Sequence, residues 1–395
     1  MASLNLNAPD HVNTPIAQGP LAGVVVVDFS RVLAGPYATA LLADLGARVI
    51  KVEPRDGDDY RHVGPWLGEE SALFASVNRG KESIVLDLKQ ATDLELALAL
   101  CDRADVVVEN FRPGVAAKLG IGAETLLARN PRLVYASISG FGQSSPMRER
   151  PAYDIIVQAL TGLMTINGDP AGPPTLVGES IGDVAAGLYG SWAMLAALYQ
   201  RERTGAGCRI DLAMFDALLA MMPLATTRYL ATGKVPQRVG NRHALSAPFG
   251  AFRTGDGHVV VAVLNTKLFE KFAAVIGRAE LAHDDRFASD SSRKAHEELL
   301  RAAFEDWSMA RSTTEVVATL SAAGVPATRI MDVGEAVDSE HAKTRGLFRE
   351  PAQGSLDLPV PEQPAGFSTM QRGRPAAAPK LDEHGAAIRA WIGKR

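Results

Sequence analysis

Asp154 is the first residue in the sequence whose type and setting suggest chemistry. It follows Tyr153 and precedes an apolar run, Ile155 to Val157. An aspartate there can cap a helix, because its side-chain oxygen accepts from the first free N–H groups. It can equally act as a nucleophile, since an ordinary aspartate is ionised at neutral pH and needs no neighbouring base. The residues alone favour the cap.

Basic residues recur in the segments between the apolar runs. Taken singly, each is more typical of a solvated surface. Together they could line a groove for a ligand with several phosphates, where arginine supplies forked hydrogen bonds and lysine a mobile point charge. The members of this set are Arg55, Arg79, Lys81, Arg112 and Lys118.

Several motifs of other enzyme classes are missing from the sequence. It contains no HExxH, no Cys/His cluster, no GxSxG elbow, no Walker A loop and no complete GxGxxG. Residues 140–143, Gly-Phe-Gly-Gln, match only the first part of the dinucleotide fingerprint. The sequence therefore gives no signal for a metal site, a serine triad or standard dinucleotide binding.

Short apolar segments alternate with helical ones in the first half of the chain. This alternation predicts an α/β fold built from βαβ units around a parallel sheet. Ligands bind such sheets at the carboxyl ends of the strands, which are the loops 30–36, 53–59, 110–114 and 139–143. The expected strands are 24–29, 49–53, 83–87, 106–109, 133–138 and one near Ile210. The expected helices are 37–45, 93–103, 154–163, 184–201 and 213–231.

The sequence changes character beyond Gly240. A hairpin is expected from residues 250–253 and 258–263, followed by charged helices, as in a smaller α+β domain. The expected domains are a loose N-terminal arm (1–20), a large domain (21–235), an inserted smaller domain (236–335) and a segment returning to the large domain (336–395).

Composition narrows the partners and the compartment. The 395 residues carry a formal net charge of -4, so nucleic acid is not an expected partner. The N-terminus lacks a signal-peptide pattern, no segment approaches an uninterrupted membrane span, and the two cysteines provide no disulfide framework. We expect a cytoplasmic protein with no membrane contact.

Seven motifs, in order and spacing, resemble the family III CoA-transferases. The resemblance covers residues 20–395, and the seven motifs together are far more specific than any one of them alone. The motifs are LAGVVVVDFSRVLAGP (21–36), DLGARVIKVE (44–53), NRGK (78–81), ENFRPG (109–114), SGFGQ (139–143), GNRH (240–243) and GVPA (324–327).

The resemblance implies a Rossmann-like large domain built from both chain ends, a smaller inserted domain, and two subunits threaded through each other as an interlocked-ring homodimer. It also implies coenzyme A thioesters as substrates with no tightly bound cofactor. It places the catalytic aspartate on Asp154, which reverses the balance between cap and nucleophile. Some relatives carry a basic residue where this chain has Pro54, so Arg55 is taken in its place. The implied CoA contacts are Leu33, Ala34, Arg55, Asn78, Arg79, Lys81, Asn110, Phe111, Arg112, Lys118, Ser139, Gly140, Phe141 and Gly142.

Two other functions remain open at this point. An α-methylacyl-CoA racemase shares the fold but uses a histidine directly before the aspartate, where this chain has Tyr153, and a second aspartate that corresponds to Asp183. A phenol is a poor base at neutral pH, so we expect a structural role for Asp183. A CoA-binding regulator without catalysis is the third possibility, which the retained Asp154 disfavours.

The strings around Arg31 and Arg79 look most similar to members that use succinyl-CoA and a short dicarboxylate or sulfinate. Glutarate, itaconate, malate, citramalate and 3-sulfinopropionate all stay open as acceptors. Backbone N–H groups of a Gly-rich loop are expected to stabilise the oxyanions. The candidates for holding the distal acid group are Arg31, Arg79, Arg242 and His243.

Overall fold

The computed structural model describes residues 19–349, 359–361, 363–368, 370 and 377–393. The chain forms two compact units. Unit 1 contains the described residues up to 162, those from 177 to 227, and those from 340 onward. Unit 2 contains residues 163–176 and 228–339. The expected smaller domain omitted residues 163–176, and the expected N-terminal arm lies, except for its last two residues, outside the described part of the chain.

A six-stranded parallel sheet forms the centre of unit 1, in the order β5-β2-β1-β6-β7-β8. The inner strands β1, β2, β6 and β7 are almost wholly buried, as expected where helices cover both faces of a parallel sheet, whereas the edge strand β8 exposes Arg209 and Asp211. The α/β class with a parallel sheet is thus confirmed. The strands are β1 (Val25–Asp28), β2 (Arg48–Glu53), β5 (Lys81–Val85), β6 (Val106–Glu109), β7 (Val134–Ser139) and β8 (Cys208–Ala213).

Helix α1 (Ala34–Asp44) packs closely against the long helix α8 (Ile181–Thr204). Gly187 permits this approach, because a Cβ atom there would lie 2.7 Å from the ring of Tyr37 and 3.0 Å from the carbonyl oxygen of Ala34. Among the described helices, α8 alone has the length and apolar composition of a membrane span, which the sequence patterns had not suggested. Buried core helices share these properties, and half of that stretch is buried within the structure.

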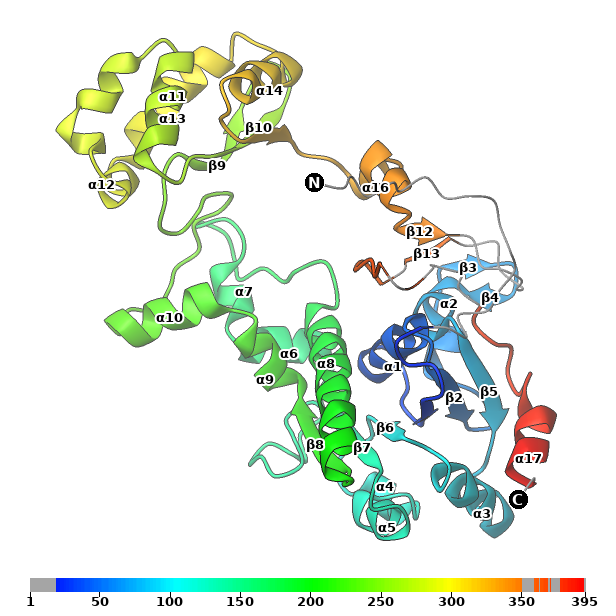
Figure 1. The fold of residues 1–395 in the computed structure, drawn as a ribbon. Coiled ribbons are helices and arrows are strands. Elements are labelled where there is room, and N and C mark those ends of the chain that lie inside the picture. Colours follow the sequence, from blue (N-terminus) through cyan, green and yellow to red (C-terminus); the bar gives the residue numbers. More distant parts are fainter. Residues whose placement is uncertain (1–18, 350–358, 362, 369, 371–376, 394–395) are drawn as a thin grey trace. The chain divides into compact units, whose positions relative to one another are not determined.

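The last described segment covers the open edge of the sheet at β5. Asp382 Oδ1 accepts from the Val85 N–H at 2.8 Å, and the His384 N–H donates to the Ser83 carbonyl at 3.0 Å. Helix α17 (Gly385–Gly393) then lies alongside β5 and α3 (Ala91–Cys101) (Figure 1). The ring of Trp391 contacts two guanidinium groups, those of Arg48 and Arg103.

Unit 2 contains a three-stranded antiparallel sheet, β11 (Ala327–Arg329), β10 (His258–Ala262) and β9 (Phe249–Arg253). The hairpin of β9 and β10 confirms the expected one, whereas β11 was not expected. Phenylalanine side chains, including Phe252, Phe272 and Phe304, form its core. The helices around it are α11 (Thr266–Val275), α12 (Asp290–Ala295), α13 (Glu297–Ser308), α14 (Thr313–Ala322) and α15 (Val333–Val337).

One expected helix is two. The stretch 213–231 divides into α9 (Met214–Ala220) and α10 (Pro223–Thr232), because Pro223 lacks an N–H and disfavours helical backbone in the residue before it. The other short elements are β3 (Trp66–Leu67), β4 (Glu70–Ser71), α2 (Ala72–Asn78), α4 (Val115–Lys118), α5 (Ala123–Arg129), α6 (Asp154–Leu160), α7 (Leu163–Ile166), α16 (Glu340–Arg345), β12 (Phe348–Arg349) and β13 (Val360–Pro361), with 3-10 turns at Asp59–His62, Ala279–His283 and Asp285–Phe287.

Candidate active site

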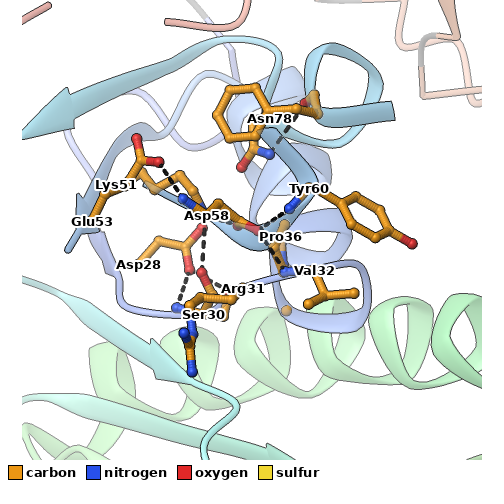
Figure 2. Close-up of polar contacts among 12 residues, drawn as sticks. Asp28, Ser30, Arg31, Val32, Pro36, Lys51, Glu53, Asp58, Tyr60 and Asn78 are labelled. Atoms are coloured by element: carbon orange, nitrogen blue, oxygen red, sulfur yellow. Dashed lines mark hydrogen bonds and ion pairs between the residues drawn. The ribbon is translucent and has the colours of Figure 1, made fainter. Parts of the chain in front are cut away.

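A buried cluster of charges lies where β1 and β2 end. Lys81 Nζ is 2.9 Å from Asp28 Oδ2, and Lys51 Nζ is 2.7 Å from Asp58 Oδ2, with all four side chains shielded from solvent. Burial alone would raise the pKa of Asp28, but the charges of Lys81 and Lys51 and the hydroxyls of Ser30 and Thr39 lower it to about 2. Figure 2 shows Asp28, Lys51 and Asp58 directed toward one another.

Three of the expected CoA contacts lie in or next to this cluster, and their side chains have partners within unit 1. Lys81 Nζ also donates to Asn78 Oδ1 at 2.8 Å and to the Pro36 carbonyl at 2.9 Å, and Asn78 itself is fully buried. Arg79 is buried too, and its guanidinium pairs with Asp44 through two hydrogen bonds of 2.6 and 3.0 Å. Their partners inside unit 1 occupy these side chains. These side chains therefore help to hold unit 1 together, and contact of Asn78, Arg79 and Lys81 with CoA stays a prediction.

The loop between β1 and α1 has a strained backbone. Val32 has a φ of 69°, a left-handed conformation that is rare for a β-branched residue. Asp58 Oδ1 accepts from the Val32 N–H at 3.0 Å and from the Tyr60 N–H at 2.9 Å, which ties this loop to the buried ion pair (Figure 2). Strain of this kind clusters at functional sites because the surrounding structure must hold it.

Two of the expected ligand loops meet at Arg31. The Arg31 N–H donates to Asn110 Oδ1 at 2.8 Å, and Asn110 Nδ2 donates to the Arg31 carbonyl at 2.7 Å. The guanidinium of Arg31 lies over the ring of Phe111 and 3.7 Å from Asp59. Arg31 remains partly exposed, so the structure keeps its charge accessible at this edge of the sheet.

Asp154 does cap a helix, but not its own. Tyr153 is the N-cap of α6, and Asp154 is the first residue inside that helix. Asp154 Oδ1 accepts from the Gly182 N–H at the start of α8, at 2.7 Å, and Oδ2 accepts from Gln158 Nε2, also at 2.7 Å. The simple cap expected from the sequence is wrong in this respect. Both carboxylate oxygens are held by donors that lie outside the first turn of α6.

Asp183, in the first turn of α8, likewise accepts a hydrogen bond from the start of another helix. The backbone N–H of Ala34, the first residue of α1, donates to its carboxyl group. Burial and the charge of Asp154 raise the pKa of Asp183 to about 7. Burial, together with the charges of Asp183, Asp58, Glu179 and Asp154, also raises the pKa of Tyr60 to about 12. Its phenol therefore stays protonated at neutral pH and can donate a hydrogen bond near the two aspartates.

The expected Gly-rich loop follows β7 and is packed closely. The Gly142 N–H donates to the Ser139 hydroxyl at 3.1 Å, and Phe141 packs against Phe215 in the interior. A Cβ atom on Gly140 would lie 2.3 Å from the side chain of Ala152. Ala152 directly precedes Tyr153, the N-cap of the helix that begins at Asp154. This loop therefore supports the segment that leads into Asp154. Leu33 and Ala34 are buried as well, and the Ala34 N–H is the group that donates to Asp183.

Three of the expected basic residues stay available for phosphate groups. Arg55, Arg112 and Lys118 are exposed, and none of them forms an ion pair with a residue that the structure describes. Arg55 follows β2 and Arg112 follows β6. Because β2 and β6 both pair in parallel with β1, their carboxyl ends lie at the same edge of the sheet.

Two acid-binding candidates, Arg242 and His243, belong to unit 2. The guanidinium of Arg242 forms a short hydrogen bond with Glu298 and lies 3.9 Å from Glu297, so nearby carboxylates already balance its charge. The ring of His243 stacks on Phe249 at 4.7 Å, and its Nδ1 accepts from the Ser246 N–H at 3.0 Å. These contacts brace the loop before β9.

The sequence patterns did not identify Gln158, Tyr60 or the Asp28–Lys51 cluster. The available signals were the i to i+4 spacing of Asp154 and Gln158, and a lysine inside the apolar strand around Lys51. Within the described residues, no group of three or more His, Cys, Asp or Glu side chains could hold a metal ion. The geometry is that of a carboxylate held by neutral donors beside a second, largely buried carboxyl group.

Comparison with known proteins decides the family. The family described as CoA-transferase family III matches residues 21–385. The chain belongs to the family III CoA-transferases. It is an enzyme, and its class is transferase.

Family III relatives with assigned reactions match almost the whole chain. The acetyl-CoA:oxalate CoA-transferase of Acetobacter aceti is 44% identical, covering 94% of this chain and 95% of the relative. A succinyl-CoA:mesaconate CoA-transferase of Haloarcula hispanica is 38% identical, covering 94% and 96%. The succinate–glutarate CoA-transferase of Agrobacterium fabrum is 36% identical, covering 96% and 97%. The crystal structure of a CAIB/BAIF family protein from Brucella suis, 39% identical, covers 95% of this chain and 99% of that chain with a TM-score of 0.84.

Proposed function

We propose that this family III enzyme transfers CoA from succinyl-CoA to a short dicarboxylate through a covalent aspartyl-CoA intermediate on Asp154. The observation that carries the proposal is the setting of Asp154. Its carboxylate is partly accessible and held by one backbone and one side-chain N–H, with no cation paired to it among the described residues. An ionised carboxylate held in this way can attack a thioester without a general base.

The reaction balances without net proton transfer. A carboxylate oxygen of Asp154 attacks the thioester carbonyl, the C–S bond breaks, and CoA leaves as a thiolate, which forms an acyl-aspartyl anhydride. The thiolate then attacks the aspartyl carbonyl, and the original acid leaves as its carboxylate. The acceptor acid repeats these steps in reverse. Holding the released groups close to Asp154 supplies a high effective concentration for each step.

The names of the relatives support the substrate class. Oxalate, mesaconate and glutarate, the acids that these relatives are named for, are all dicarboxylates. A dicarboxylate needs a cation for its distal group, and Arg31 is the acid-binding candidate of unit 1 whose charge stays accessible. Arg79, the other candidate in that unit, is buried against Asp44.

We also propose a homodimer, as the family resemblance implies. One face of α8 carries large apolar side chains that unit 1 leaves open, with Trp192 and Tyr199 each 67% exposed and Leu188 on the same side. Exposed aromatic faces of this kind are typical of subunit interfaces. A second copy of this chain is the proposed partner, and light scattering should give twice the mass of one chain.

The direct test uses Asp154→Asn. We expect the variant to lose exchange between succinyl-CoA and a panel of dicarboxylates by more than about a thousandfold, because an amide is not a nucleophile. Mass spectrometry of the wild type with succinyl-CoA should show a hydroxylamine-sensitive adduct on Asp154, absent in the variant, while CoA binding persists. Substantial exchange by the variant removes Asp154 from this role.

One observation favours a second reaction. A carboxyl group with a pKa near 7, such as that of Asp183, is suited to move a proton at the carbon next to a thioester, as a racemase does. The position where a racemase carries its histidine, however, is occupied by Tyr153, whose side chain is 72% exposed. Incubation of a 2-methylacyl-CoA in D2O separates the reactions, because a racemase incorporates deuterium at that carbon and a transferase does not.

A further inference from the structure

The amide of Gln158 has a fixed orientation. Its side chain is 1% exposed, and its Oε1 accepts from the Val177 N–H at 2.9 Å. Since only the oxygen of an amide can accept that bond, Nε2 must face Asp154 Oδ2, at 2.7 Å. Asp154 and Gln158 are four residues apart on α6 and therefore share one face of the helix. The side chain is held at both ends and fixes the plane of the Asp154 carboxylate.

The donors to the two oxygens of Asp154 differ in whether they have another acceptor. Gln158 Nε2 has two further acceptors, the carbonyl oxygens of Glu179 at 3.2 Å and Val177 at 3.4 Å. Gln158 can therefore release Oδ2 without leaving a buried donor unsatisfied. Gly182, in contrast, lies in the first turn of α8, where an N–H has no partner within the helix, and Oδ1 is its acceptor among the described residues.

The start of α8 also favours negative charge on Oδ1. Twenty-four residues of helix place the positive end of their dipole at this N-terminus. A Cβ atom on residue 182 would lie 3.0 Å from Oδ1, so the glycine allows the carboxylate to approach the backbone this closely. An oxygen that gains charge during the reaction is best stabilised by a donor of this type.

We propose, as a step that rests on the proposed function, that Oδ2 of Asp154 is the attacking oxygen and that Gln158 is the positioning residue that directs it. Oδ1 remains the carbonyl oxygen throughout, and the Gly182 N–H stabilises its charge when the CoA thiolate adds to Cγ. Collapse of that adduct breaks the Cγ–Oδ2 bond, and Oδ2 departs in the released acid. The acceptor acid returns one of its own oxygens to the same position.

This assignment has an isotopic consequence that can be measured. The enzyme is incubated for many turnovers with succinyl-CoA and excess succinate labelled with 18O in both carboxyl groups. Mass spectrometry then gives the number of 18O atoms in the peptide that contains Asp154. The expected result is one 18O atom in Asp154, because Oδ1 never exchanges. Two 18O atoms in the wild-type peptide overturn the assignment. Active transfer with no label in this peptide instead overturns the proposed covalent role of Asp154, so the two failures are distinct.

The variant Gln158→Met tests the positioning role. It keeps the volume and removes the donor, so the carboxylate can rotate, and we expect two 18O atoms together with a fall in kcat of roughly 10- to 100-fold at unchanged KM for the donor. A single 18O atom and an unchanged kcat in this variant contradict the proposal.

Gln158→Glu keeps the proposal testable if Gln158→Met fails to fold. The new carboxyl group can still accept from Val177, but it must carry a proton to donate to Asp154. We expect activity to recover as the pH falls, and the exposed matched control Gln90→Glu to follow the wild-type pH profile. A Gln158→Glu profile that matches the wild type at every pH overturns the role of Gln158.

Discussion

Asp183 interacts electrostatically with Asp154, and burial together with the charge of Asp154 raises the pKa of Asp183 to about 7. Each carboxyl group accepts a backbone N–H from the next helix, Gly182 of α8 for Asp154 and Ala34 of α1 for Asp183. The starts of α6, α8 and α1 are thus linked in series. Positive helix ends compensate two carboxyl groups that would otherwise repel each other.

Asp183→Asn should stabilise the protein above neutral pH. The unfolded chain releases the proton of Asp183 near the ordinary pKa of 3.8, whereas the folded chain keeps it to about 7. Between these values the folded state binds more protons, so its free energy of unfolding falls as pH rises. We expect the Tm advantage of the variant to be small below pH 4 and to grow until about pH 8, by roughly 2 to 4 °C per kcal/mol. Asp306→Asn, at an exposed position, is the control, and an advantage independent of pH would contradict this.

Lys81→Met should lower the free energy of unfolding without a selective effect on CoA binding. It leaves the charge of Asp28 in the interior with one lysine fewer, which costs about 3–5 kcal/mol when a buried pair is broken. Denaturant unfolding measures the loss, and Asp28→Asn added to Lys81→Met should restore part of it. If Lys81→Met instead weakens CoA binding at unchanged stability, Lys81 contacts the ligand after all.

Arg112→Gln should act on substrate binding alone. An exposed arginine that contacts a phosphate contributes about 1.5–3 kcal/mol, so we expect KM for succinyl-CoA to rise by roughly tenfold or more at low salt. A succinyl-pantetheine thioester, which carries no phosphate, should show the same KM with variant and wild type. The control Lys89→Gln removes an exposed charge after β5. Equal losses for both substrates would exclude a phosphate contact.

Gly182→Ala should lower kcat with little effect on folding. Alanine is favoured over glycine in a helix, but its Cβ would press on Asp154 Oδ1 at 3.0 Å and touch Leu218 and Val157 at 3.6 Å. A displaced nucleophile costs roughly 10- to 100-fold in rate. Gly178→Ala is the matched control, because no atom lies within 4 Å of its added Cβ. Equal kcat values in these two variants would show that the contact with Oδ1 has no catalytic effect.

The inner strands β1 and β6 were predictable because each is a short run of valines, and the run around Val106 to Glu109 matches β6 at both ends. Helix starts were less predictable. Helix α1 begins at Ala34, three residues before the expected start, and Gly35 and Pro36 of the expected loop 30–36 lie in its first turn. Proline is tolerated there, since the first N–H groups of a helix have no partner within it.

The roles of the basic residues were not predictable from their types. Lys81 and Arg112 look alike in the sequence, but Lys81 meets Asp28, 53 positions earlier in the chain, and Arg112 stays in solvent. Which lysine lies beside a buried aspartate depends on the pairing of β5 with β2 and of β2 with β1, and that order is a property of the folded sheet. Asp154 was found because its motifs surround it, whereas Gln158 carries no chemistry of its own and acts only through its fixed amide.

The cover on the β5 edge has a consequence for the order of synthesis. Ser83 leaves the ribosome 301 residues before His384, which is roughly 15 to 60 s at usual translation rates. During that interval the N–H and C=O groups of β5 that Asp382, His384 and Arg389 later occupy are open to any other strand. The protection of the sheet edge is therefore synthesised about 300 residues after the strand itself, and the nascent chain is exposed to edge-to-edge pairing until α17 has been made.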